Sequence, residues 1–257
     1  QLFLGISPEN LARIPFRPVL TDGSVCDAKE YLPECESAKL LIVPDIAGFV
    51  GADTVGCVLS TEIDRAEDLT LLVDIGTNGE MILFTGTNRG SRYFGASAAA
   101  GPALEGAGIS TGVGGIVGAV SAVADVNGQI IAKTIGSGPP VGICGSGLID
   151  LAAVLLSHEE LDETGYLEDE PVTYAETADG TPLTLTQEDI RALQLAKSAM
   201  RAGMEALCDA AEIPLTALSK IAVAGGVAAN SQIRADILAA AEKLGAQVYM
   251  PPLSLCG

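Results

Sequence analysis

A carboxylate beside a glycine-rich turn is the clearest chemical feature of the sequence. The β-prone run 70–73 leads into Asp74, a polar turn follows over 76–79, and a second apolar run occupies 81–84. Glycines let a turn reach positive φ, and consecutive N–H groups in such a turn form a nest for anions, phosphate above all. A carboxylate beside that phosphate is placed to hold Mg²⁺ through water. We therefore expect Asp74 to support a metal ion, and these residues to bind phosphate: Gly76, Thr77, Asn78 and Gly79.

The element that must position this turn is a β-hairpin, because the pattern is that of a strand, a tight turn and a returning strand. For this turn alone, an ordinary structural hairpin is as good an interpretation as a phosphate cradle. A second glycine-rich strand end favours the cradle. The run 220–226 predicts a buried strand that ends in Gly225 and Gly226, where a flat ring can approach the backbone. A helix over 228–244 and a strand over 247–250 complete a parallel crossover.

Two further segments offer residues for a site. Glu105 lies just inside a predicted helix start at Pro102. We prefer compensation of the helix dipole as its role over an indirect contact to a metal ion or a contact to water. Asp74 and Glu105 are the carboxylates that we expect to act in catalysis. Gly145 and Ser146 begin a helix that runs to about residue 156, and its free N–H groups could meet an anion. A plain helix start, with Ser146 or a neighbour as its cap, is equally consistent with that sequence.

Hydrophobic spacing and turn signals predict the remaining elements. They are a strand over 40–43, a helix over 46–59, a strand within 89–97, a hairpin around Asn127 and Gly128, and a long amphipathic helix after a capping box at 186–189. Proline-broken residues 13–35 are expected to be largely irregular or extended, and the acidic residues 158–179 to form a surface loop. His158 is the sole histidine, and we expect it to be solvated.

Charge and composition exclude several classes of function. The 257 residues carry a net charge of −19. Binding to nucleic acid or to an anionic membrane needs clustered Lys and Arg, so we expect neither partner. The longest apolar stretch, 116–126, is too short to span a bilayer and no signal-peptide pattern is present, which predicts a cytoplasmic protein. The six cysteines form no close pair, which predicts reduced thiols rather than a zinc site or an iron–sulfur cluster.

The expected elements of residues 71–250 are a three-stranded meander, helical segments, a strand, a helix and a strand. This order resembles the repeating unit of the actin-like ATPases (the ASKHA superfamily), which include sugar kinases, actin and the heat-shock chaperone ATPases. A closer resemblance rests on four ordered motifs. Residues 49–54, 74–80, 101–107 and 142–150 are similar to the C-terminal domain of the reductive activators of corrinoid proteins.

That resemblance implies an α/β, actin-like (ribonuclease H-like) lobe with a mixed sheet flanked by helices. Residues 1–68 would then be part of a first lobe with a connecting helix, and residues 69–257 a second, nucleotide-binding lobe. In such proteins ATP, with Mg²⁺, drives reduction of a Co(II) corrinoid to Co(I) by an N-terminal [2Fe–2S] domain. The expected partners are a nucleotide and a corrinoid protein, and a homodimer is compatible with the resemblance.

The sequence departs from that family in two ways. Neither the [2Fe–2S] domain nor the family's earlier Asp-Ile-Gly-Thr hairpin is found, so we expect no cluster in this chain, and the missing hairpin argues against ATP hydrolysis by the chain alone. Residues 224–234 and 248–256 resemble instead the tRNA threonylcarbamoyladenosine-forming proteins of the same superfamily, in which Asn230 would lie near the nucleoside. That family's histidine metal pair has no counterpart here, so only the adenosine-site role is carried over.

Two other functions stay open at this point. One is another enzyme of the superfamily, such as a small-molecule kinase or a carbamoyl transferase. The other is a non-catalytic module whose acidic surface binds a partner protein.

Overall fold

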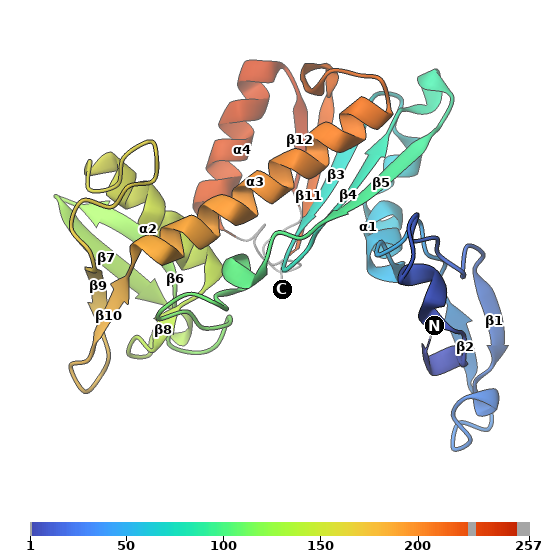
Figure 1. Cartoon of the computed structure of the whole chain (residues 1–257), viewed down its shortest axis with the longest axis horizontal. Helices are drawn as coiled ribbons and strands as arrows, with labels where there is room; N and C mark the ends of the chain where they lie inside the picture. Colours follow the sequence, from blue (N-terminus) through green and yellow to red (C-terminus); the bar gives the residue numbers. More distant parts are fainter. Residues whose placement is uncertain (1, 226–229, 251–257) are drawn as a thin grey trace.

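A five-stranded mixed sheet is the centre of the fold (Figure 1). The computed structural model describes residues 2–225 and 230–250. The strand order is β12-β11-β3-β4-β5, with β4 antiparallel to both β3 and β5, and β11 parallel to both β3 and β12. The strands are Thr70–Ile75 (β3), Gly79–Phe84 (β4), Tyr93–Ala98 (β5), Lys220–Ala224 (β11) and Gln247–Tyr249 (β12). The meander and the parallel crossover confirm the α/β fold with a mixed sheet.

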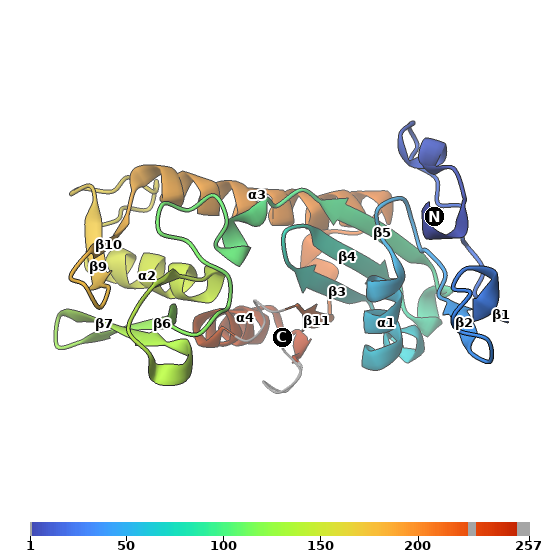
Figure 2. The same ribbon diagram turned by 90° about the horizontal axis from the view of Figure 1, so that it is seen from below.

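Helices cover both faces of this sheet, as Figure 2 shows. The long helix α3 (Gln187–Ala210) packs on one face and α1 (Ala52–Thr61) on the other. Side chains alternate along β3 and β4 to suit the two sides. Leu71, Val73, Met81 and Leu83 meet α3, whereas Leu72, Ile82 and Phe84 meet the α1 side. Burial on both faces explains why these strands read as continuous apolar runs.

A second body is inserted between β5 and α3, over residues 99–186. It holds a three-stranded sheet, a two-stranded hairpin and a helix around a separate core. The elements are β6 (Ala119–Val126), β7 (Gln129–Thr134), β8 (Gly142–Ile143), α2 (Gly145–Ser157), β9 (Val172–Glu176) and β10 (Pro182–Leu185). The expected turn at Asn127 and Gly128 is confirmed, because it joins β6 to β7.

The prediction of a surface loop over residues 158–179 is wrong in its second half. Val172 and Tyr174 of β9 are buried with Leu183 and Leu185 of β10, so the hairpin closes the core of the inserted body. Acidic residues before β9 hide this alternation in the sequence.

Helix α3 joins the two bodies. Its 24 residues span about 36 Å, and it starts with the expected capping box at Thr186 and Asp189. Ile190 near its start belongs to the core of the inserted body, and Met200 to the core of the sheet. The helix therefore runs along both bodies (Figure 1).

The N-terminal residues form a small hairpin at one end of the molecule (Figure 2). Strands β1 (Ser24–Asp27) and β2 (Lys39–Ile42) pair antiparallel. Helix α1 begins at Ala52 rather than near residue 46, because Ala47 and Val50 form a β-bridge and Phe49 has a φ of 63°. A positive φ at a non-glycine residue cannot continue a helix.

The last helix, α4 (Ser231–Leu244), lies between β11 and β12 in the chain and completes the crossover. Among the described residues, no helix is long and apolar enough to cross a membrane.

Candidate functional site

The predicted turn lies where β3 ends. Ile75 pairs with Gly79, and the Gly76 N–H donates to Asn78 O across the turn at 3.2 Å. Thr77 and Asn78 at its tip are exposed. The tight turn expected from the sequence is therefore present and open to solvent.

The glycines of the turn do not supply the positive φ that was expected of them. Neither Gly76 nor Gly79 has a positive φ. A side chain at Gly79 would overlap the sulfur of Met200 on α3, so glycine lets the helix pack against the hairpin. A Cβ at Gly76 would lie 3.6 Å from Glu105 Oε1 and would enter the space beside the turn. Space, rather than conformational freedom, explains both glycines.

Glu105 contacts this turn directly. It ends a short 3₁₀ helix, η6 (Pro102–Glu105), and its carboxylate accepts hydrogen bonds from the Thr77 N–H at 3.2 Å and from the Thr77 hydroxyl. The expected helix start at Pro102 is confirmed, although the helix is a 3₁₀ helix of four residues. The preference for dipole compensation by Glu105 is wrong, since Glu105 ends this helix and its carboxylate binds Thr77. No local pattern signals this contact, because packing alone brings the two segments together.

Asp74 lies among other acidic and polarisable groups. The Cys57 thiol donates to Asp74 Oδ2 at 3.7 Å, and Asp74 pairs with Glu80 across the hairpin. Burial, together with the negative charge of Asp53, raises the pKa of Asp74. Burial and then Asp74 and Asp53 raise the pKa of Glu80 in the same direction. Burial, followed by Asp74, raises the pKa of the Cys57 thiol to about 11, so it stays protonated at neutral pH and can donate.

These carboxylates suit a hard cation that keeps part of its water shell. A cavity of about 290 Å³ opens beside them, lined by Asp53, Glu80 and residues near Phe49. Among the described residues, no group of three or more His, Cys, Asp or Glu side chains could hold a metal ion unaided. Mg²⁺ is usually held by one or two carboxylates, waters and substrate phosphates, so Asp74 fits this metal together with a phosphate.

The end of β11 meets the same turn. Ala224 pairs with Asp74, and Gly225 follows with a φ of +86°. A Cβ at Gly225 would lie 2.5 Å from Asp74 Oδ1 and 2.6 Å from Ile75 O, so only glycine fits. The structure therefore brings two of the predicted motifs together, although they are about 150 residues apart in the chain. Gly226 lies outside the described residues.

Gly145 and Ser146 are the first residues of α2, which packs against η6. A side chain at Gly145 would overlap Leu104 O, so glycine allows the start of α2 to approach η6 closely. Ser146 does not cap α2, since Cys144 occupies the cap position and the Ser146 hydroxyl donates to Ser121 O at 2.8 Å. An anion contact from either residue stays a prediction.

Asn230 has a structural role that the sequence did not predict. It is buried at the start of α4, where its side-chain oxygen accepts from Ile233 N at 2.7 Å. Its amide nitrogen donates to Ser146 O at 2.8 Å and to Asp150 Oδ1 at 3.0 Å. A nucleoside contact from Asn230 stays a prediction. Both amide hydrogens are already donated, so a further contact that keeps these bonds would have to use the second lone pair of the side-chain oxygen.

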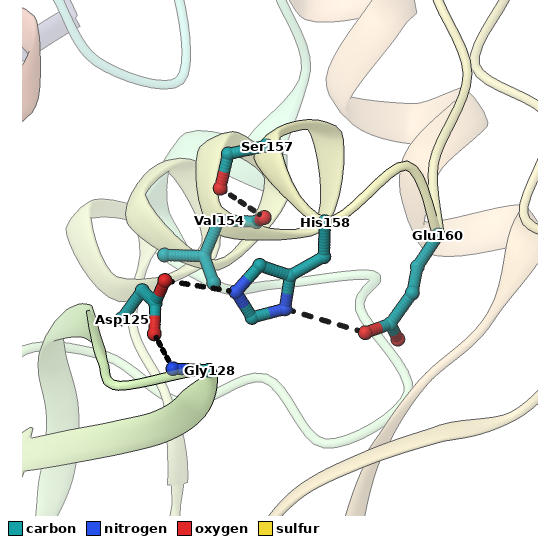
Figure 3. A network of polar contacts seen from close by, with 6 residues as sticks. All are labelled: Asp125, Gly128, Val154, Ser157, His158 and Glu160. Carbon is teal, nitrogen blue, oxygen red and sulfur yellow. Dashed lines mark hydrogen bonds and ion pairs between the residues drawn. The ribbon is translucent and has the colours of Figure 1, made fainter.

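The expectation that His158 is solvated is wrong. Figure 3 shows His158 between Asp125 and Glu160. Nε2 lies 3.2 Å from Asp125 Oδ2, Nδ1 lies 3.3 Å from Glu160 Oε1, and the side chain is only 16% exposed. The cysteines of the described residues are free thiols, as expected: Cys26, Cys35, Cys57, Cys144 and Cys208.

Comparison with known proteins identifies the family. A family profile described as "C-terminal domain of RACo the ASKHA domain" matches residues 68–239. The chain belongs to this RACo family. A second profile, "RACo middle region", matches residues 1–66 of the same chain. The two matches meet close to the expected boundary at 68, and the assignment of 1–68 to a partial first lobe stays a prediction.

One relative matches most of the chain, and a second matches a shorter part of it. The "Corrinoid activation enzyme RamQ" of Eubacterium limosum is 34% identical over 249 residues, covering 88% of this chain and 41% of that protein. The "[Co(II) methylated amine-specific corrinoid protein] reductase" of Methanosarcina barkeri is 40% identical over 102 residues, 38% of this chain and 18% of that protein. The RACo-family chain thus spans less than half the length of the relatives that it matches.

A solved structure supports the same assignment. The "Reductive activator for corrinoid,iron-sulfur protein" superposes with a TM-score of 0.77 at 32% identity, covering 88% of this chain and 38% of that one. The expected local similarity to another family is also found. A tRNA N6-adenosine threonylcarbamoyltransferase of Acaryochloris marina is 64% identical over 39 residues, 15% of this chain and 11% of that protein.

Proposed function

We propose that this chain binds the phosphates of ATP at the β3–β4 turn and forms the nucleotide-binding part of a corrinoid activator. The observation that carries the proposal is the convergence of Asp74, the turn and Gly225 at one edge of the sheet. The carboxyl ends of parallel strands are the usual place for ligands in α/β folds.

Each part of the site has a role in this proposal. The N–H groups of residues 76–79 would donate to phosphate oxygens, and Asp74 would hold Mg²⁺ through water. When bound, the metal would neutralise phosphate charge, and it would also offset the repulsion between Asp74, Asp53 and Glu80. The backbone at the end of β11, which Gly225 lets lie against Asp74, would contact the adenosine. Glu105 as a catalytic carboxylate, together with Asp74, belongs to the same proposal.

The wider function is proposed from family membership. ATP binding and hydrolysis would drive electron transfer from a [2Fe–2S] domain outside this chain to a Co(II) corrinoid, giving Co(I). The names of the two curated relatives, one a corrinoid activation enzyme and the other a corrinoid-protein reductase, support this activity. The partner would be a corrinoid protein.

Substitution of Gly76 by valine tests the nucleotide site. The backbone of Gly76 has no positive φ, so valine fits the fold, but its side chain would fill the space beside the turn. Each charge-assisted hydrogen bond contributes about 1.5–3 kcal/mol, so losing two lowers Mg-ATP affinity by at least about a hundredfold. Isothermal titration calorimetry measures this change.

Gly56→Val provides the matched control, because Gly56 of α1 is exposed, has no positive φ and has nothing within 4 Å of its Cβ position. This variant is expected to bind Mg-ATP as the unmodified chain does. No heat of binding to the unmodified chain, or equal affinity of the Gly76→Val variant, contradicts the proposal.

A further inference from the structure

One carboxylate holds both donors of Thr77. Oε1 of Glu105 accepts the backbone N–H at 3.2 Å and Oε2 accepts the side-chain hydroxyl. Thr77 lies at the tip of the turn proposed to bind phosphate. A carboxylate presents two anionic oxygens on one centre, as a phosphoryl group does, so Glu105 occupies the donors as an anionic ligand would.

The negative charge of Glu105 has no cationic partner within the part of the chain that the structure describes. The ion pairs found there join other side chains. Within the described residues, Thr77 supplies the hydrogen-bond donors to this exposed carboxylate. A second anion at the same turn would meet like-charge repulsion as well as competition for the donors.

Packing fixes Glu105 in this place. The two residues before it are buried in different cores, with Ala103 in that of the inserted body and Leu104 in that of the sheet. The close approach of Gly145 to Leu104 O blocks a shift of η6 toward α2. The two cores thus hold the backbone of η6 beside the turn, and the exposed Glu105 side chain reaches Thr77 from there.

We propose that Glu105 is an internal competitor for the phosphate site, which holds Thr77 until a nucleotide phosphate displaces it. The inference rests on the proposed function, since it concerns regulation of the same site. Nucleotide affinity is then lowered by the cost of breaking the two bonds, and displacement frees a carboxylate at the end of η6. Because η6 packs against α2, nucleotide binding and the inserted body are linked through this residue.

Two substitutions of Glu105 test the competition. Glu105→Gln keeps the shape but removes the charge, and Glu105→Ala removes the ligand entirely. Titration calorimetry with Mg-ATP is expected to give affinity in the order unmodified, Glu105→Gln, Glu105→Ala, with the last at least about tenfold tighter than the first. Glu188→Gln is the control, since it removes one exposed carboxylate from the first turn of α3 and should leave the affinity unchanged.

Amide hydrogen exchange tests the contact without any nucleotide. The Thr77 N–H is expected to exchange more slowly in the unmodified protein than in Glu105→Ala, because the carboxylate bond is lost. Equal exchange in the two proteins overturns the inference. Equal Mg-ATP affinity also overturns it while leaving the proposed function intact, whereas no binding by any variant overturns both.

Discussion

Glycine residues around the turn act mainly by making room. Gly79 admits Met200, Gly76 leaves space beside Glu105, and Gly225 lies against Asp74. The sequence analysis expected these glycines to supply the positive φ of an anion-binding nest. Of the three, only Gly225 has a positive φ, so that reason is wrong for Gly76 and Gly79. The residue that makes each glycine necessary lies on another element, and local sequence does not reveal which residue that is.

At the scale of single residues, His158 makes a pH-dependent contribution to the free energy of unfolding. Hydrogen bonds to Asp125 and then Glu160 raise its pKa above 6.5 (Figure 3). The protonated form therefore stabilises the folded protein fully below pH 6.5, and this stabilisation is lost as the pH rises through the raised pKa. We expect His158→Gln to lower the free energy of unfolding more at pH 5.5 than at pH 8.5, as measured by urea denaturation.

Asp125→Asn is a partner test for the same pair. His158 lowers the pKa of Asp125, which shows that the two side chains interact. In the Asp125→Asn background, the loss of unfolding free energy caused by His158→Gln should therefore differ much less between pH 5.5 and pH 8.5. An equal effect of His158→Gln at both pH values contradicts the predicted role.

At the scale of elements, the side chain of Asn230 joins two helices. It caps α4 and donates hydrogen bonds to Ser146 and Asp150 of α2. Loss of an N-cap costs about 1 kcal/mol, and an unsatisfied buried partner costs about 1–3 kcal/mol. Asn230→Ala should therefore lower the free energy of unfolding by about 2–4 kcal/mol in urea denaturation.

The exposed Asn88 offers a control for that measurement, and Asn88→Ala should change stability by less than about 0.5 kcal/mol. A similarly small loss for Asn230→Ala would show that the junction between α2 and α4 does not depend on this residue.

Elements whose pattern lies within a few neighbouring residues could be predicted from the sequence. Elements that depend on contacts with distant parts of the chain could not. The hairpin 70–84, the turn at Asn127 and the capping box at Thr186 follow from residues within a few positions of each other. The β9–β10 hairpin was missed because acidic residues conceal its alternation. The start of α1 was misplaced because a β-bridge at Ala47 competes with helix there.

The candidate site divides in the same way. Asp74 and the turn follow from one short stretch, and the meeting with Gly225 follows from the order of strands. The contacts of Glu105 and Cys57 depend on how η6 and α1 pack, so the sequence offered no direct sign of them.

At the scale of the whole molecule, the sheet and the inserted body share α3 and also meet through η6. The proposed nucleotide site lies where η6 and the sheet come together. A ligand bound at the turn would thus contact a junction of both bodies. Shared elements of this kind can carry an effect from a binding site to a distant surface when they have two arrangements.

A crystal structure of the chain with Mg²⁺ and a non-hydrolysable ATP analogue tests the central claim most directly. The account predicts phosphate oxygens within hydrogen-bond distance of the N–H groups of residues 76–79, Mg²⁺ beside Asp74, and the adenosine near Gly225. A triphosphate bound elsewhere on the chain, with the turn left unaltered, would contradict it.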